Sequence, residues 1–225
     1  MSNENQLLID LPLVADEDAD EELGSLAATA IADEDLQGSR LLLALKSVRP
    51  IDIEGMPGGL IEISCTFQPG YNTRFTWARL TVMLQSPEGV KIVDLAPREI
   101  KDEQPVKISV DSKGSLGLKK APAEASLDKT VKEEYEVYQC LVRGSGESTA
   151  KARWDFNEND HRQSGLGTEQ TLVMTLPVTG KVSGLVLMNA RLARSGVEGA
   201  LSAVRDLVVG ARQRDSTFSV EIPKE

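Results

Sequence analysis

The chain has 225 residues, of which 40% are hydrophobic and 4% aromatic, with two cysteines and a formal net charge of −10. This length allows one large domain or two small ones, and two cysteines are too few for a disulfide-dense secreted scaffold. No stretch approaches the roughly 18–20 apolar residues of a membrane-spanning helix, and the first residues lack the positive charge of a secretory signal. We therefore expect a cytoplasmic protein with reduced thiols and no membrane span.

The negative charge is concentrated at the N-terminus. Residues 1–38 contain eleven acidic residues and no lysine or arginine, whereas the rest of the chain holds 24 acidic and 25 basic residues. A highly charged segment without aromatic residues is typical of disorder. The sequence therefore predicts an acidic, mostly disordered N-terminal arm with short hydrophobic motifs at residues 1–38, followed by a folded domain at residues 39–225.

Two apolar motifs interrupt this acidic arm. The first lies within residues 7–14, and the second follows helical spacing between residues 23 and 31. They permit three interpretations: a solvating tail, an arm that docks on another protein or on another copy of this chain, and a tail that folds back on its own domain. Under the docking interpretation, the candidate partner-binding residues are Leu7, Leu8, Ile9, Leu11, Leu13, Leu23, Leu26 and Ile31.

From residue 39 onward the apolar residues recur with a period of two, which is typical of half-buried strands. Prolines fall between the apolar stretches, where a missing amide donor does not disturb a sheet. Short strands separated by turn signals favour an all-β sandwich of about ten to eleven strands. Besides the central region treated next, the expected strands are residues 41–48, 60–67, 75–84, 90–95, 106–110, 115–119, 131–142 and 217–222.

The clearest pattern lies between Ala150 and Leu192, where it predicts three consecutive strands. In the first of them Trp154 and Phe156 alternate with charged residues, so we expect Trp154 to be buried. A Pro-Val-Thr-Gly sequence at residues 177–180 predicts a hairpin turn between the second and third strands. The three strands should therefore form a β-meander.

One helix is expected at residues 197–209, where it would cap one open end of the sandwich. Leu201, Val204, Leu207 and Val208 follow helical spacing, and Gly210 fits a C-terminal stop.

The spacing of cysteine and aromatic residues forms a further pattern. Trp77 follows Cys65 by twelve residues, and Tyr138 stands two residues before Cys140. This resembles the immunoglobulin domain, which has a core Trp on the strand after its first Cys and a Tyr two residues before its second. The resemblance implies an immunoglobulin-like or related Greek-key topology, with the two cysteines facing each other across two sheets. The chain departs from the family by continuing for 85 residues past Cys140.

The loop at residues 155–162 offers the best candidate chemistry, because it combines Asn and Asp residues with the single histidine, His161. A zinc site has too few ligands, and no Gly-x-Ser-x-Gly motif supports a catalytic triad. The loop begins like an EF-hand, but Asp160 and Leu166 occupy positions that require Gly and Glu. A looser calcium site is left open beside an ordinary polar turn. We expect no catalytic, cofactor or metal-binding residues.

Partners follow from the charge distribution. Nucleic-acid binding is disfavoured, because the domain is nearly neutral and the arm would repel phosphates. The predicted function is therefore a non-enzymatic protein–protein interaction or adaptor module, with the acidic-hydrophobic arm as its docking element. One alternative is a structural subunit of a multi-subunit assembly that exchanges its N-terminal arm with neighbours. Another is a ligand-binding domain or enzyme of unrecognised type, which a cavity lined by polar groups would favour.

Overall fold

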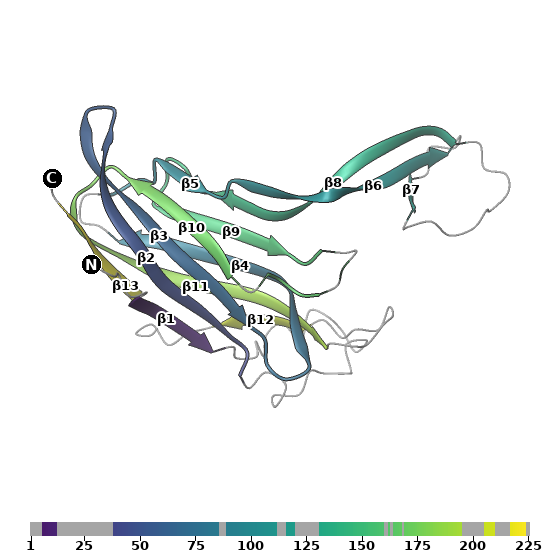
Figure 1. Ribbon diagram of the computed structural model, residues 1–225, viewed down its shortest axis with the longest axis horizontal. Helices are drawn as coiled ribbons and strands as arrows, with labels where there is room; N and C mark the ends of the chain where they lie inside the picture. Colours follow the sequence, from purple (N-terminus) through teal and green to yellow (C-terminus); the bar gives the residue numbers. More distant parts are fainter. Residues whose placement is uncertain are drawn as a thin grey trace.

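The computed structural model describes residues 6–12, 38–85, 89–111, 116–119, 131–159, 162, 164–167, 169–194, 205–209 and 217–223. Within these ranges the regular structure consists of thirteen β-strands in two antiparallel sheets (Figure 1). The all-β prediction is confirmed, and two sheets with a core between them are consistent with a sandwich. The described part contains no helix that is long and apolar enough to cross a membrane.

The first sheet has five strands in the order β1-β2-β3-β10-β5. Their bounds are β1 Gln6–Pro12, β2 Arg40–Ile53, β3 Met56–Gln68, β5 Asp94–Ala96 and β10 Glu169–Leu176. The turn between β2 and β3 uses Glu54 and Gly55, which both have positive φ, and the Gly55 amide donates to Asp52 Oδ1 at 2.8 Å. Because a left-handed backbone suits glycine, this tight turn fixes the register of the hairpin.

The second sheet has eight strands in the order β12-β11-β4-β9-β8-β6-β7, with β13 also paired to β11. Their bounds are β4 Thr73–Gln85, β6 Glu99–Asp111, β7 Leu116–Lys119, β8 Val131–Ser145, β9 Lys151–Asn157, β11 Gly180–Arg194, β12 Arg205–Val209 and β13 Thr217–Ile222. The β6 and β8 strands form a long hairpin whose outer part runs beyond the other strands (Figure 1).

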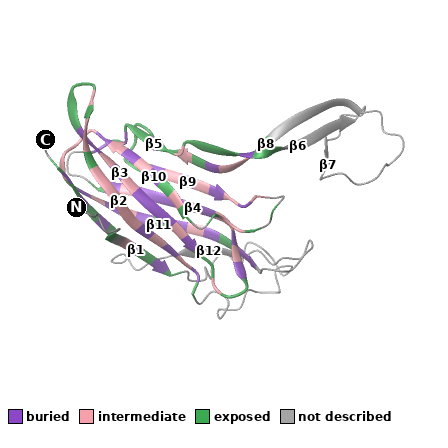
Figure 2. Cartoon of the chain, viewed as in Figure 1, coloured by how far each residue is buried: buried purple, intermediate pink, exposed green. Residues whose placement is uncertain are grey.

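The core lies between the two sheets, and buried residues alternate with more exposed ones along β9, β10 and β13 (Figure 2). Burial in β9 alternates with period two, and Trp154 and Phe156 are both buried, as the sequence predicts. Trp154 is among the largest fully buried side chains, together with Phe75, Leu41, Ile61 and Met174. The scarcity of aromatic residues therefore leaves an aliphatic core with a few rings at its centre.

The predicted meander is wrong in its pairing. β9 and β11 belong to the eight-stranded sheet, but β10 between them pairs with β3 and β5 of the other sheet. The residues at 177–180 therefore carry the chain from one sheet to the other instead of closing a hairpin. The inner faces of both sheets show the same alternation, so a period of two gives the buried face of a strand and not the sheet to which it belongs.

The predicted helix at residues 197–209 is also corrected. Residues 205–209 form β12, which pairs antiparallel with β11 over five residues, from Met188↔Val209 to Leu192↔Arg205. The sequence Leu207-Val208-Val209 that supplied part of the apolar helix stripe suits an edge strand equally well, because β-branched residues favour strands. Residues 197–204 lie outside the described part of the chain.

The immunoglobulin resemblance does not extend to its central features. Cys65 is buried on β3 of one sheet and Cys140 is half-buried on β8 of the other, and both thiols are free. Trp77 lies outside the core, with the guanidinium carbons of Arg79 and Arg191 each 5.3 Å from the centre of its ring. Of the two tryptophans, the buried one is Trp154, on β9.

Candidate functional site

A cavity of about 670 Å³ opens where the β6–β8 hairpin leaves the sandwich. Its apolar floor includes Phe67 from the five-stranded sheet, and Phe156 and Val142 from the eight-stranded sheet. The rings of Phe67 and Phe156 meet edge to face, with their centroids 5.0 Å apart. This edge-to-face packing is a favoured geometry for aromatic pairs. The floor is therefore a fixed aromatic surface that spans the gap between the two sheets.

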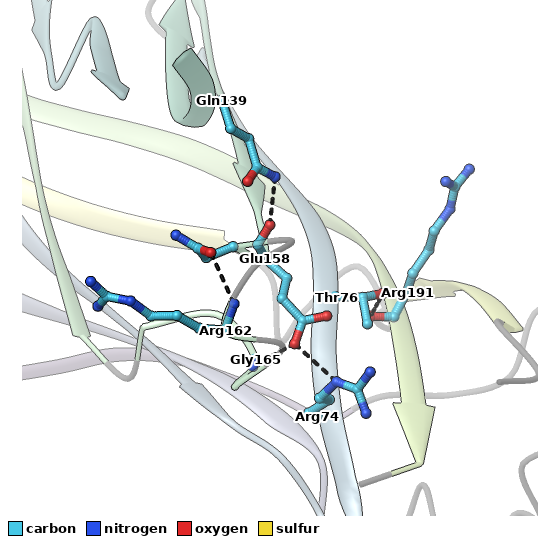
Figure 3. A network of polar contacts seen from close by, with 8 residues as sticks. Arg74, Thr76, Gln139, Glu158, Arg162, Gly165 and Arg191 are labelled. Carbon is cyan, nitrogen blue, oxygen red and sulfur yellow. Dashed lines mark hydrogen bonds and ion pairs between the residues drawn. The ribbon is translucent and has the colours of Figure 1, made fainter. Parts of the chain in front are cut away.

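The chain between β9 and β10 crosses from one sheet to the other and forms one wall of the cavity. Its described residues are fastened by Glu158, whose side chain is 10% exposed (Figure 3). Glu158 Oε1 accepts from Arg74 Nε at 2.9 Å and from the Gly165 amide at 2.6 Å. The Glu158 backbone carbonyl accepts from Gln139 Nε2 at 2.8 Å. The carboxylate of Glu158 thus ties this wall to β4, and its backbone carbonyl ties the wall to β8.

The buried pair of Glu158 and Arg74 has an energetic consequence. The Arg74 side chain is only 14% exposed, so removing its carboxylate partner would leave a cation with little access to water. The Leu166 amide also donates to the Phe75 carbonyl at 2.9 Å. These contacts hold residues 165–166 against β4 in a single position. The wall is therefore built before any ligand arrives, which lowers the ordering cost of binding.

The opposite wall comes from an irregularity in β6. The register with β8 jumps between Lys101↔Cys140 and Pro105↔Tyr138, so residues 102–104 bulge out of the ladder. Bulges redirect side chains, and here the carboxyl group of Asp102 is buried and accepts from Asn159 Nδ2 at 2.7 Å. This bond joins the bulge to the chain that leaves β9, and so links the two walls.

The carboxyl group of Asp102 is held in its ionised form. Burial acts to raise its pKa, but the hydrogen bond from Asn159 and those from the backbone amides of residues 103 and 104 lower it. The charge of Arg162 acts in the same direction, and the resulting pKa lies below the ordinary value of an aspartate. A carboxylate that is satisfied in this way is a weak proton acceptor at neutral pH, because its conjugate acid is strong.

The mouth of the cavity carries both signs of charge. Lys101 Nζ is paired with Glu99 Oε2 at 3.2 Å. Arg162 and Glu103 also line the cavity and are exposed, and the charge of Arg162 acts on the carboxylate of Asp102. Gln170, on β10 of the five-stranded sheet, also lines the cavity.

The calcium interpretation of residues 155–160 gains no support from the placement of its oxygens. Asp155 pairs with Arg79, whose Nε lies 2.5 Å from Oδ1, and Asn157 Nδ2 donates to the Cys140 carbonyl at 3.0 Å. In the described ranges, no group of three or more His, Cys, Asp or Glu residues could hold a metal ion. Asp160 and His161 lie outside those ranges.

The candidate partner-binding residues of the N-terminal arm are placed in part. Residues 6–12 form β1, which pairs with β2 at the edge of the five-stranded sheet. Ile9 and Leu11 are buried in the core, and Leu8 packs against it. Leu7 lies on β1, but its side chain is not described; Leu13, Leu23, Leu26 and Ile31 fall outside the described residues. The division of the chain at residue 38 stays a prediction, although β1 belongs to the same sheet as β2.

The predicted adaptor function is therefore corrected. Its docking element required apolar side chains that are free to contact a partner, whereas Ile9 and Leu11 are buried in the core of the same chain. The exchange of this strand with a neighbour is corrected for the same reason, because β1 already pairs with its own β2.

Sequence reasoning missed the cavity but not all of its parts. The polar loop after β9 stood out for its Asn, Asp and His residues, and it does form one wall. No local signal showed that Glu158 is buried, because its partner Arg74 is 84 residues away. The jump in the β6 register was equally hidden. One sequence signal was available: in the expected strand at residues 131–142, Tyr135 and Val137 lie on one side and Tyr138, Cys140 and Val142 on the other. A bulge explains such a change of faces, and this segment pairs with the bulged part of β6.

No protein-family model matches the chain, and no curated protein matches its sequence. Among solved structures, the delta-toxin of Clostridium perfringens aligns over 81% of this chain and 82% of its own, with 12% identity and a TM-score of 0.35. A structure named as a pore forming protein aligns over 82% and 85%, with 11% identity and a TM-score of 0.33. The Clostridium perfringens NetB toxin in its membrane inserted form aligns over 81% and 88%, with 12% identity and a TM-score of 0.28. Likenesses at these TM-scores support no inference about family or function.

Proposed function

We propose that this protein binds a small molecule, without transforming it, in the cavity at the root of the β6–β8 hairpin. The observation that carries the proposal is the cavity itself, whose volume of about 670 Å³ falls in the range of small-molecule sites. Such sites combine an apolar lining with a few polar groups that fix orientation. Phe67 and Phe156 supply the lining, and Gln170 and Arg162 are among the polar groups.

Binding without catalysis follows from the state of the two buried carboxylates. Glu158 is engaged by Arg74 and by the Gly165 amide. Asp102 is engaged by Asn159 and has a lowered pKa. General acid–base catalysis needs a group whose pKa lies near the operating pH, and a carboxylate with a lowered pKa is far from that condition. Both groups therefore serve to build the walls.

The test is a fragment screen by ligand-observed NMR on the full chain, with variants that fill the cavity. Ser164 lines the cavity and is exposed, so Ser164→Trp should block its mouth without disturbing the core. Gly167→Leu is a second filling variant, because a Cβ there would meet only the flexible end of Gln170, at 2.9 Å. Ser219→Trp places the same bulk on an exposed position of β13, away from the cavity.

We expect fragments that bind the unchanged protein and Ser219→Trp but lose binding to both filling variants. The proposal is wrong if no fragment binds the unchanged protein. It is also wrong if every fragment that binds does so equally well to the folded filling variants, because the ligands would then sit elsewhere.

A further inference from the structure

We infer that the open edge of β10 binds an extended, uncharged peptide segment of a partner protein, which adds to the five-stranded sheet as a further antiparallel strand. The inference goes beyond the proposed function, because it rests on backbone groups of β10 and not on the binding of a small molecule. Three features carry it: the short extent of β5, the direction of the unpaired backbone groups, and the charge and side-chain pattern of this edge.

The neighbouring strand β5 covers only part of β10. Whereas β10 pairs with β3 along its whole length, β5 pairs only with residues 173–175. This pairing stops before Pro97, which has no amide hydrogen to donate. The Arg98 carbonyl then accepts from the Gly144 amide of β8 at 2.8 Å, so the chain leaves β10 and joins the other sheet. In the described part of the chain, residues 169–172 are therefore an open edge.

The backbone groups of this open edge point away from β3. The Thr175 carbonyl accepts from the Val93 amide at 2.9 Å, on the side of β10 where β5 lies. Successive residues of a strand direct their amide and carbonyl groups to opposite edges, so alternate residues share an edge. Thr171 and Glu169 therefore present theirs on the same side as Thr175, beyond the end of β5. Such groups form a template to which an extended peptide can pair.

The edge offers no unpaired charge to a partner. Glu169 is its one ionisable residue, and its carboxylate is paired with Lys46 at 2.8 Å and accepts from Ser64 Oγ at 2.8 Å. The hydroxyl of Thr171 accepts from the same lysine at 3.0 Å. A charged side chain opposite these residues would find no counter-ion on the edge strand. Charge complementarity therefore favours an uncharged segment.

The side chains of an added strand would fall alternately on the two faces of the sheet. On one face of β10, Leu172 is buried and Gln170 lines the cavity. On the other face, Glu169 and Thr171 are exposed. Every second side chain of the added strand would therefore lie on the face where the cavity is, whose floor includes Phe67. The partner segment that fits has apolar side chains at alternate positions.

The test is an NMR titration of the isotope-labelled full chain with one capped heptapeptide, acetyl-Lys-Val-Thr-Val-Thr-Val-Lys-amide. Its valines share one face, and its terminal lysines keep it soluble outside the paired positions. In antiparallel pairing, residues that exchange hydrogen bonds carry their side chains on the same face. The peptide threonines, on the face of Thr171, therefore direct their amides to β10. We expect the backbone amide signals of Thr171 and Glu169 to shift on titration.

Two N-methylated forms of the heptapeptide distinguish strand addition from other binding. Methyl groups on both threonine amides remove the donors that face β10, so they should weaken binding about tenfold or more. Methyl groups on the amides of the last two valines face away from β10 and should change the affinity by less than about twofold. Equal effects of the two methylated forms would overturn the inference.

Two substitutions at Thr171 provide the matched test on the protein. Thr171→Pro removes the amide on the open side of β10 and keeps the pairing with β3, because proline is tolerated where the amide of an edge strand faces solvent. It should weaken binding of the unmethylated peptide about fivefold or more. Thr171→Val removes only the hydroxyl and should bind as the unchanged protein does. Similar losses in both variants would mean that the side chain makes the contact, and the inference would be wrong.

The outcomes are separable from those of the fragment screen. If Thr171→Pro does not fold, the methylated peptides decide the question on the unchanged protein. If fragments bind but the heptapeptide shifts no β10 signal at millimolar concentration, this inference falls alone. If the heptapeptide binds with the expected dependence on methylation and no fragment binds, the proposed function falls alone.

Discussion

The two ends of the sandwich are closed by different chemistry. The register of β3 with β10 runs from Gly59↔Leu176 at one end to Thr66↔Glu169 at the other. At the first end the packing is so close that a Cβ on Gly59 would lie 2.5 Å from Ile222 Cγ2. At the second end, polar side chains hold a connecting segment across the gap and leave a cavity of about 670 Å³.

This difference shows how a sandwich can keep one end open without losing its fold. Apolar contacts have no preferred direction, so apolar side chains from the two sheets pack together until little space is left between them. Hydrogen bonds and ion pairs fix distances between particular atoms, as Glu158 does with Arg74 and Gly165. A wall fastened by such bonds can stand beside an apolar floor without collapsing on it.

The largest expected effect is at the closed end. Leu176→Ala removes a fully buried side chain and should lower the free energy of unfolding by about 2–5 kcal/mol. Leu166→Ala makes the same change in the half-buried wall of the cavity, where the lost contacts are fewer, so its cost should be clearly smaller. Urea denaturation measures both. Equal costs would mean that the open end is packed as tightly as the closed one.

The next effect concerns the carboxylate that fastens the wall. Glu158→Gln should cost roughly 1.5–3 kcal/mol of unfolding free energy, because charge-assisted hydrogen bonds are lost and Arg74 is left largely buried. Glu62→Gln removes one partner of an ion pair with Arg49, whose side chain is 61% exposed, and should cost under about 1 kcal/mol. If the two variants were equally stable, the Glu158 network would not be what holds the wall.

A smaller effect should appear on acidification, at Asp102. Its folded-state pKa is lowered, so its contribution to stability is present above the unfolded-state value of about 3.9 and is lost only as pH falls further, through the folded-state pKa. The NMR signals of the Asn159 side-chain amide should therefore stay unchanged until pH falls below that value. They should then move as the Asp102–Asn159 bond breaks, unless the protein carries Asp102→Asn. Movement at higher pH would contradict the lowered pKa.

The least disruptive probe compares the two thiols. Burial raises the pKa of Cys65, and this residue lies in the closed core. Cys140 is half-buried on β8, beside the cavity wall. Because the thiolate is the reactive form, iodoacetamide at pH 8 should label Cys140 first and Cys65 only on unfolding. Mass spectrometry of peptides from the native protein checks the order, and labelling of Cys65 at the same rate would show that the core opens.

The sequence was sufficient for much of the fold. The expected strand at residues 217–222 coincides with β13, and that at 115–119 differs from β7 by one residue. Trp154 is buried as its alternation predicts. Sheet membership was beyond reach, because β10 and β11 show the same alternation in different sheets. The edge pairing of residues 205–209 was hidden as well, since it depends on β11 and not on local propensity.

The site was predictable only as separate parts. Its floor joins Phe67 to Phe156, which are far apart in sequence and lie on different sheets. The burial of Asp102 depends on a jump in strand register that alternation does not reveal. A polar loop and a pair of aromatic strands could therefore be recognised, but their convergence on one cavity could not.

The placement of β1 at the edge of its sheet bears on aggregation. β2 is fourteen residues long, with Leu41 and Leu43 buried in the core. If β1 were absent, β2 would present a long row of unpaired amides and carbonyls that strands of other molecules could extend. β1 itself carries Asp10, which is paired with Arg40 at 3.3 Å, and ends at Pro12. Charge and proline both discourage the addition of a further strand. β1 therefore covers the edge of β2 and protects the five-stranded sheet from aggregation.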